Sequence, residues 1–163
     1  MNDNLLTAKA IFEKTLQSHG DKIALIHEGK TVSYRQLLLS AYRVAHAMVK
    51  RGVKPNTRVA LIMSNCIEYV ISDMGLIFAG GTKVPLNDML GEKEITYILQ
   101  DSGAEMAIVG SNFFDIVSRI RGQLPQLKHL VGVAPAAECP EGFEPWAAFQ
   151  GNEPEVPVDV QVT

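Results

Sequence analysis

Glycine-rich turns are the parts of this sequence in which phosphate-binding chemistry would be easiest to recognise. A P-loop needs the pattern G-x-x-x-x-G-K-[ST], because successive backbone N–H groups must surround the phosphates, and the sequence contains no such pattern. The dinucleotide-binding pattern G-x-G-x-x-G is also absent. The adjacent glycines Gly80 and Gly81 follow a predicted helix rather than a strand, so we interpret them as the end of that helix.

Four histidines and two cysteines are the side chains that could bind a metal or act in acid–base and nucleophilic chemistry, namely His19, His27, His46, His129, Cys66 and Cys139. A zinc site needs three or four ligands at short spacing, and neither cysteine belongs to a C-x-x-C pair. No histidine has a second group beside it that would orient it as a general base. We therefore expect no metal site and no catalytic histidine. We expect His46 to be solvated and both cysteines to be buried, reduced thiols.

Serine and asparagine side chains at predicted turns are the next candidates. No serine lies in a G-x-S-x-G nucleophile elbow. We interpret Ser33 and Ser64 as caps of the helices that follow them. Asn65 lies at a predicted strand-to-helix turn, and ligands of α/β sheets bind at the carboxyl ends of the strands. Asn65 is therefore a candidate ligand contact, and a capping role is the alternative.

The other polar or aromatic candidates have simpler explanations. Lys83 is a lone cation on a predicted strand and is expected to be solvated or at an interface. Glu92 and Glu94 fall in the first turn of a predicted helix, where acids are favoured without any function. Trp146 and Phe149 are expected to pack rather than to stack on a ligand. The sequence therefore assigns no catalytic, no cofactor-binding and no metal-binding residue.

The first elements that the pattern predicts are a helix, a hairpin and a second helix. Apolar residues at helical spacing predict a helix over 5–19, and two β-prone runs over 23–32, joined by Glu28 and Gly29, predict a β-hairpin. Ser33 and Gln36 form a capping box at the start of the next helix. Its predicted buried stripe consists of Leu37, Ala41, Val44, Ala45 and Met48, and Gly52 is expected to end it.

Strands and helices are predicted to alternate from residue 59 onward. The apolar run 59–63 is typical of a strand buried on both faces. A helix up to Ala79, a strand with Pro85 at a strand end or sheet edge, and a helix over 92–100 follow. A strand at 106–109, a helix ended by Gly122, and a last strand at 129–133 complete the series. The sequence thus predicts an α/β fold with a mostly parallel sheet covered by helices, preceded by an N-terminal helix and hairpin.

Residues 134–163 show neither helical nor strand periodicity. Five prolines interrupt this stretch, at positions 135, 140, 145, 154 and 157. We therefore predict an α/β part over 1–133 and an irregular, proline-rich tail over 134–163 that leads toward a missing downstream region.

Composition and charge exclude several classes of protein. Hydrophobic residues make up 47% of the chain and charged residues 20%, which is ordinary for a globular domain. The net charge is −3, and basic residues do not gather into a patch, so we expect no nucleic-acid partner. No apolar run is long enough for a membrane span, and no signal peptide is recognisable. We expect a soluble, cytoplasmic chain.

Five stretches form an ordered series along the chain: TVSYRQL at 31–37, GVKPNTRVA at 52–60, NCIEY at 65–69, IFAGGTKVPLN at 77–87 and ITYILQDSGA at 95–104. Together they resemble the motifs of adenylate-forming enzymes, except that Asn56 stands where that family usually has glycine. The segment 86–90 lacks the proline that usually follows in peptide-synthetase adenylation domains, so it is more similar to acyl- and aryl-CoA ligases.

The resemblance implies the N-terminal subdomain of an acid–thiol ligase, an acyl-CoA synthetase of fatty acid metabolism. Such enzymes join a carboxylic acid to ATP with Mg²⁺, release pyrophosphate and pass the acyl group to coenzyme A. Their phosphate loop, nucleotide contacts and C-terminal lysine have no matching position in this sequence. We therefore expect an N-terminal fragment that binds no cofactor and is inactive alone, whose partners are the missing downstream ligase domains, and which could self-associate. The alternative is a stand-alone α/β binding or interaction module derived from the same family.

Overall fold

The structure is a computed structural model that describes residues 7–160 of the chain. Its α-helices are α1 (Ala8–Ser18), α2 (Tyr34–Lys50), α3 (Ile67–Ala79), α4 (Glu92–Ser102), α5 (Phe114–Ile120) and α6 (Trp146–Gln150). Its strands are β1 (Ile23–His27), β2 (Lys30–Ser33), β3 (Arg58–Ile62), β4 (Thr82–Leu86), β5 (Met106–Gly110), β6 (His129–Val133) and β7 (Glu144–Pro145). Three short 3₁₀ turns, at Ser111–Phe113, Arg121–Gln123 and Ala136–Glu138, complete the described chain.

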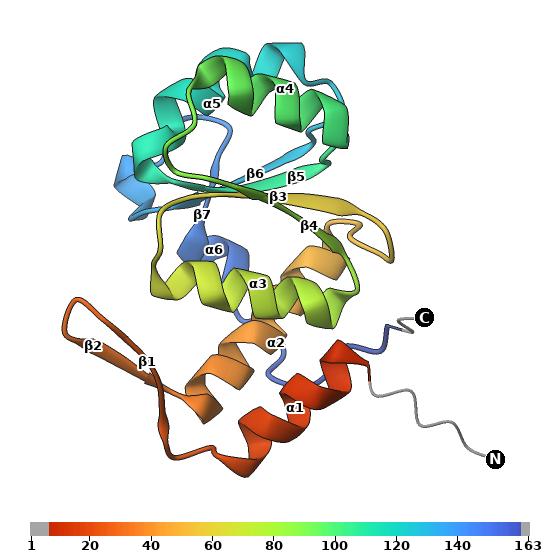
Figure 1. Ribbon diagram of the computed structural model, residues 1–163, viewed down its shortest axis with the longest axis vertical. Helices are drawn as coiled ribbons and strands as arrows, with labels where there is room; N and C mark the ends of the chain where they lie inside the picture. Colours follow the sequence, from red (N-terminus) through yellow and green to blue (C-terminus); the bar gives the residue numbers. More distant parts are fainter. Residues whose placement is uncertain (1–6, 161–163) are drawn as a thin grey trace.

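A five-stranded sheet forms the centre of the fold. The strand order is β4-β3-β5-β6-β7, and every neighbouring pair is parallel. Helices α4 and α5 cover one face, whereas α3, α6 and α2 lie on the other, with α1 outside α2 (Figure 1). Strand β4, which contains Pro85, lies at an edge of the sheet. The predicted α/β class, the parallel sheet and the edge position are therefore confirmed.

The central strand β3 divides its side chains between two hydrophobic cores. Val59 and Leu61 point into the core shared with α2 and α3, while Ala60 and Ile62 point into the core shared with α4 and α5. All four are at most 1% exposed. Because successive side chains of a strand point to opposite faces, a continuous apolar run is what a strand covered on both sides requires.

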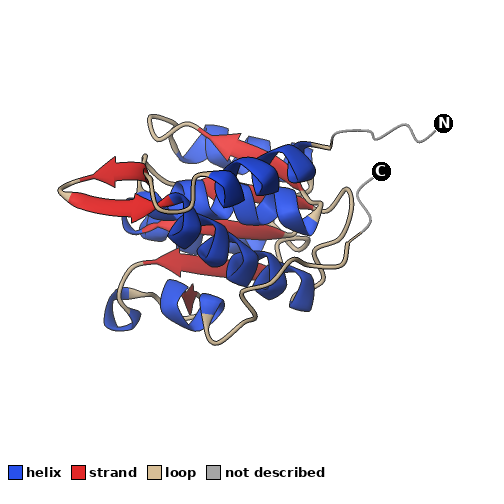
Figure 2. Ribbon diagram, turned by 90° about the horizontal axis from the view of Figure 1, so that it is seen from below, coloured by secondary structure: helices blue, strands red, loops and turns tan. Residues whose placement is uncertain are grey.

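The N-terminal helix and the hairpin lie outside the main sheet. The hydroxyl of Thr7 accepts a hydrogen bond from the N–H of Ala10 and so caps α1. The sequence predicts that this helix starts at Leu5, which lies outside the described residues. Strands β1 and β2 pair antiparallel and project from the body (Figure 2).

A hydrogen bond joins α2 to α1, because the Tyr42 phenol donates to Glu13 at 3.1 Å. Burial of the phenol raises the pKa of Tyr42 to about 12, and the negative charge of Glu13 acts in the same direction.

Helix α2 follows the sequence prediction closely. Ser33 and Gln36 exchange both hydrogen bonds of the capping box. The helix ends next to Gly52, which has a φ of 90°, a conformation that a Cβ atom disfavours. All five residues of the predicted stripe are buried, at 0–4% exposure: Leu37, Ala41, Val44, Ala45 and Met48.

Two predicted helix boundaries are wrong. Helix α3 begins after Cys66, and no side chain caps it, so Ser64 and Asn65 are not its caps. Helix α5 ends at Ile120, and a 3₁₀ turn over Arg121–Gln123 follows, so Gly122 lies within that turn. Gly80 does end α3, in the left-handed conformation with a φ of 76°.

The tail is more regular than its prolines suggest. Strand β6 is not the last strand, because Glu144 and Pro145 pair with Val131 and Gly132 of β6 to form β7. Helix α6 follows, and its Phe149 is completely buried. The division of the chain at residue 133 stays a prediction.

We expect Ser33→Ala to lower the free energy of unfolding by about 1 kcal/mol, because the N–H of Gln36 loses its hydroxyl acceptor. Denaturant-induced unfolding measures this change. Ser33→Thr is the matched control, since threonine keeps a capping hydroxyl and should retain most of the stability. A Thr variant as unstable as the Ala variant would contradict the capping role.

We expect Met48→Ala to cost more, about 2–5 kcal/mol, because Met48 is fully buried in the core beneath α2 and its truncation leaves a cavity. The same unfolding measurement applies. Ile26→Ala, at a side chain that is 73% exposed, serves as the surface control and should change the stability by less than about 0.5 kcal/mol. The opposite ranking of Met48→Ala and Ser33→Ala would mean that the buried face of α2 is misassigned.

Candidate functional site

The carboxyl ends of the parallel strands meet at one edge of the sheet. After β3, the chain continues through α3 to β4 on one side of β3, and then through α4 to β5 on the other side. Helices α3 and α4 cover opposite faces (Figure 1). The direction of winding therefore reverses beside β3, and such a switch point leaves a crevice where ligands of α/β proteins bind.

Two adjoining pockets form this carboxyl-edge crevice. The first has a volume of about 430 Å³ and lies across the ends of β3, β5 and β6. The second has a volume of about 420 Å³ and lies across the ends of β3 and β4. Met63, Ser64 and Asn65 line both pockets, so the turn between β3 and α3 forms the middle of the crevice.

Asn65 is the sequence candidate that the structure brings to this site. Its side chain does not cap α3, which begins after Cys66 without any side-chain cap. Asn65 lines both pockets of the crevice and also a third, smaller pocket of about 170 Å³ beside β1. The rule that ligands of α/β sheets bind at the carboxyl ends of the strands therefore predicted the position of Asn65 correctly. Its contact with a ligand remains a prediction.

The far wall of the crevice comes from residues that the sequence did not single out as ligand contacts. Ser111 and Asn112 belong to the 3₁₀ turn that follows β5, and Trp146 begins α6. Gly110 precedes that turn, and a Cβ atom there would meet the Cβ of Met63 at 2.9 Å. The glycine therefore allows the ends of β3 and β5 to approach closely. A polar pair directly after a buried strand was the available signal for Ser111 and Asn112.

The charged side chains that line the crevice are acidic. Glu68 lines the first pocket and Asp88 the second, and among the described residues no lysine or arginine lines either one. Burial raises the pKa of the Cys66 thiol, and the charge of nearby Glu68 acts in the same direction. Cys66 is therefore a poor source of thiolate, which makes it a poor nucleophile.

The polar, aromatic and acidic side chains that line the crevice suit a ligand with an uncharged, planar group better than an anionic ligand. The hydroxyl and amide side chains can donate and accept hydrogen bonds, and the half-buried indole of Trp146 offers an aromatic surface. Within residues 7–160, no three histidine, cysteine or acidic side chains gather to hold a metal ion.

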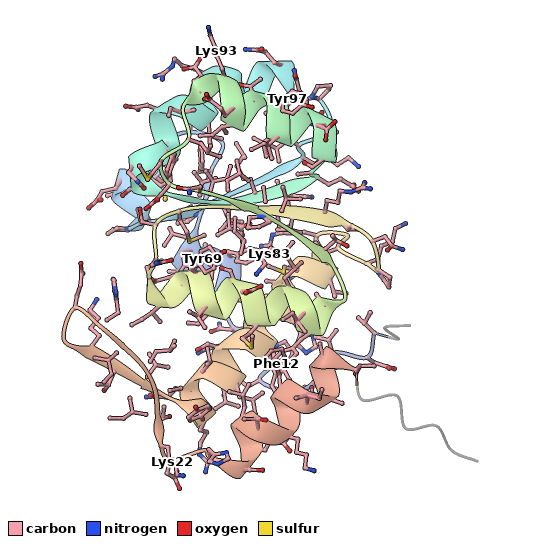
Figure 3. The ribbon with its side chains drawn as sticks, viewed as in Figure 1. Phe12, Lys22, Tyr69, Lys83, Lys93 and Tyr97 are labelled. Carbon is pink, nitrogen blue, oxygen red and sulfur yellow. The ribbon has the colours of Figure 1, made fainter. Side chains whose placement is uncertain are left out.

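The other candidates lie apart from the crevice or have structural partners. Lys83 is exposed, as expected, and it pairs with Asp73 at 2.8 Å; Figure 3 shows it on β4 beside α3. His46 is half-buried and therefore less exposed than predicted, and its Nε2 lies 3.0 Å from the carbonyl oxygen of Val156. The outer face of α4 carries Lys93 and Tyr97 (Figure 3).

The remaining sequence candidates also have structural surroundings. Both cysteines are free and only half-buried, so they are less buried than predicted. Glu92 pairs with Arg119 at 2.9 Å. The rings of Trp146 and Phe149 lie 5.9 Å apart, so the predicted packing of this pair is confirmed.

No helix in the described part of the chain has the length and apolar character needed to cross a membrane.

Comparison with solved structures identifies close relatives of the fold. The structure of an anthranilate CoA ligase in complex with anthranoyl-AMP superposes with a TM-score of 0.89 at 28% sequence identity, covering 96% of this chain and 30% of that chain. A fatty acyl CoA synthetase from Mycobacterium tuberculosis superposes with a TM-score of 0.83 at 22% identity, over 98% of this chain and 31% of that chain.

Curated relatives include both ligases and peptide synthetases. The 4-hydroxybenzoate–CoA/benzoate–CoA ligase of Rhodopseudomonas palustris is 29% identical over 83% of this chain and 29% of its own length. Bacitracin synthase 2 of Bacillus licheniformis is 33% identical over 66% of this chain and 4% of its own length. The chain thus spans less than a third of the length of these relatives.

A family model matches most of the sequence. The model described as "AMP-binding enzyme" matches residues 12–160, which include the carboxyl-edge crevice and both cores. Because this match covers most of the chain, and because the relatives just described are adenylate-forming enzymes, the protein belongs to the AMP-binding enzyme family.

Proposed function

We propose that this chain is the N-terminal part of an AMP-forming acyl- or aryl-CoA ligase. The parent enzyme activates a carboxylic acid with ATP and transfers the acyl group to coenzyme A. The observation that carries the proposal is the similarity to the anthranilate CoA ligase, which extends over 96% of this chain at 28% identity. The segment 86–90, which lacks the proline usual in peptide synthetases, also favours a CoA ligase over an adenylation domain.

The residues of the crevice do not fit the phosphates of ATP. A triphosphate is bound by cations, by a metal ion or by a glycine-rich loop, whereas the charged residues here are Glu68 and Asp88. Residues outside this chain must therefore bind the phosphates and the Mg²⁺ of the parent enzyme.

We also propose a cytoplasmic location for the parent enzyme.

We expect the chain by itself to show no acid-dependent exchange between ATP and pyrophosphate. Preorganised cations and backbone donors supply much of the rate in phosphate chemistry, and no lysine or arginine of the described chain lines the crevice. Exchange of labelled pyrophosphate into ATP measures the activity, with benzoate, anthranilate and a medium-chain fatty acid as acids. A heat-inactivated sample gives the background and a complete CoA ligase the positive control. Exchange above background would contradict the proposal that this chain is only part of the enzyme.

We further propose that the isolated chain self-associates through exposed apolar side chains. The tail contributes less to such a surface than its sequence suggests, because Phe143 and Phe149 are buried. The large exposed side chains include Ile26 on the hairpin, at 73%, and Met89 after β4, at 88%.

We expect the sedimentation coefficient to rise with concentration, and we expect the double variant Ile26→Lys, Met89→Lys to weaken this rise and the binding of a hydrophobic dye. Lys22→Gln, at an exposed polar position, is the control and should behave like the original chain. A monomer at every concentration that binds no dye would contradict self-association and would favour a stand-alone module.

A further inference from the structure

The last described segment of the chain, residues 152–160, crosses the outer surface of α2 and is called the strap below. Two ion pairs join the strap to this helix. Lys50 Nζ lies 2.8 Å from an oxygen of Glu153, and Arg43 Nε lies 3.4 Å from an oxygen of Glu155. The second pair is poorly aligned, since Arg43 Nε is buried without a hydrogen bond among the described residues. The first pair therefore combines charge with a directed hydrogen bond from Lys50 to Glu153, whereas the second acts by charge alone.

Two further contacts are made to carbonyl oxygens of the strap. His46 Nε2 lies 3.0 Å from the carbonyl oxygen of Val156, and Lys9 Nζ donates to that of Val158 at 2.8 Å. A carbonyl oxygen only accepts, so His46 carries its proton on Nε2. Because Lys9 belongs to α1, the strap connects the end of α6 to the first helix of the fold.

Within the part of the chain that the structure describes, the backbone of the strap forms no hydrogen-bond ladder with the rest of the fold. The strap's backbone–backbone hydrogen bonds within the described residues are local ones, from Glu153 N–H to Gln150 and from Val160 N–H to Val158. Pro154 and Pro157 have no N–H to donate. Val158 is buried, at 5% exposure, whereas Val156 is 55% exposed. Buried Val158, partly buried Val160 and a few side-chain contacts therefore hold the whole segment.

We propose that the strap is a charge-held latch that opens as a unit from α2 and that loosens α1 when it opens. Ion pairs near the surface contribute little each, and salt screens them. Segments with few buried apolar contacts and no backbone ladder open at low free-energy cost. The latch is independent of the proposed function, because it depends only on contacts within this chain.

Helix α1 is the element that the latch most affects. Leu16 is its buried apolar residue, and Phe12, labelled in Figure 3, packs only partly against the core. Glu13 reaches Tyr42 of α2, and Lys9 reaches the strap. Opening the strap removes the Lys9 contact and uncovers Val158, so the backbone of α1 should become less protected although the sequence separation is about 150 residues.

The experiment uses Val158→Cys as a reporter in the full chain. The thiol is covered when the strap is closed, so its alkylation rate, followed by mass spectrometry of the peptide, measures opening; Cys66 and Cys139 are read in separate peptides. Glu153→Gln and Glu155→Gln should each raise the rate about twofold to fivefold. Both changes should also speed hydrogen exchange of the α1 amides.

Charge exchange and salt separate the latch from simple destabilisation. The double variant Lys50→Glu, Glu153→Lys should return the rate to within about twofold of the reporter alone. Salt at 1 M should speed alkylation of the reporter chain but not of the chain in which both glutamates are neutralised. Glu141→Gln, at an exposed tail position, is the matched control. Unchanged alkylation in the Gln variants, an equal increase in the control, or unaffected α1 amides would overturn the proposal.

Discussion

Burial of β3 on both faces is the constraint on which the rest of the structure depends. Each of its buried side chains enters one of two cores, and those cores require helices on both sides of the sheet. Helices on both faces in turn require the chain to pass from α3 on one face to α4 on the other, with β4 and β5 on opposite sides of β3. The carboxyl-edge crevice exists because of that reversal, so core packing and the candidate site have a common cause.

The chemistry of the crevice reflects which residues can follow a buried strand. Each strand end must satisfy its backbone and turn sharply, and small polar residues such as Ser64, Asn65 and Ser111 meet both needs. These residues form hydrogen bonds but carry no charge. A ligase that handles a triphosphate therefore needs cations from residues outside this chain, while the crevice offers amides, hydroxyls and the indole of Trp146.

Local interactions explain which elements were predictable from the sequence. The capping box of Ser33 and Gln36 and the stripe that includes Met48 lie within one helix, so sequence spacing alone determined them. Strands β3, β5 and β6 were also predictable, because burial on both faces leaves a continuous apolar run. The start of α3 was not, because Ser64 has the residue type of a cap but the helix begins after Cys66. Residue type predicted a cap that the backbone geometry does not use.

The tail shows the limit of such reasoning, because distant residues hold it in place. Strand β7 has two residues, too few for a period-2 pattern, and it forms because Glu144 pairs with Arg51 at the end of α2 while its backbone meets β6. The guanidinium of Arg51 also lies 4.8 Å from the ring centre of buried Phe149. One basic residue thus orders both a strand and a helix about 95 positions later in the chain. The same long-range packing brings Trp146 to the crevice, which is why its sequence neighbourhood, rich in proline, gave no indication of a position at the candidate site.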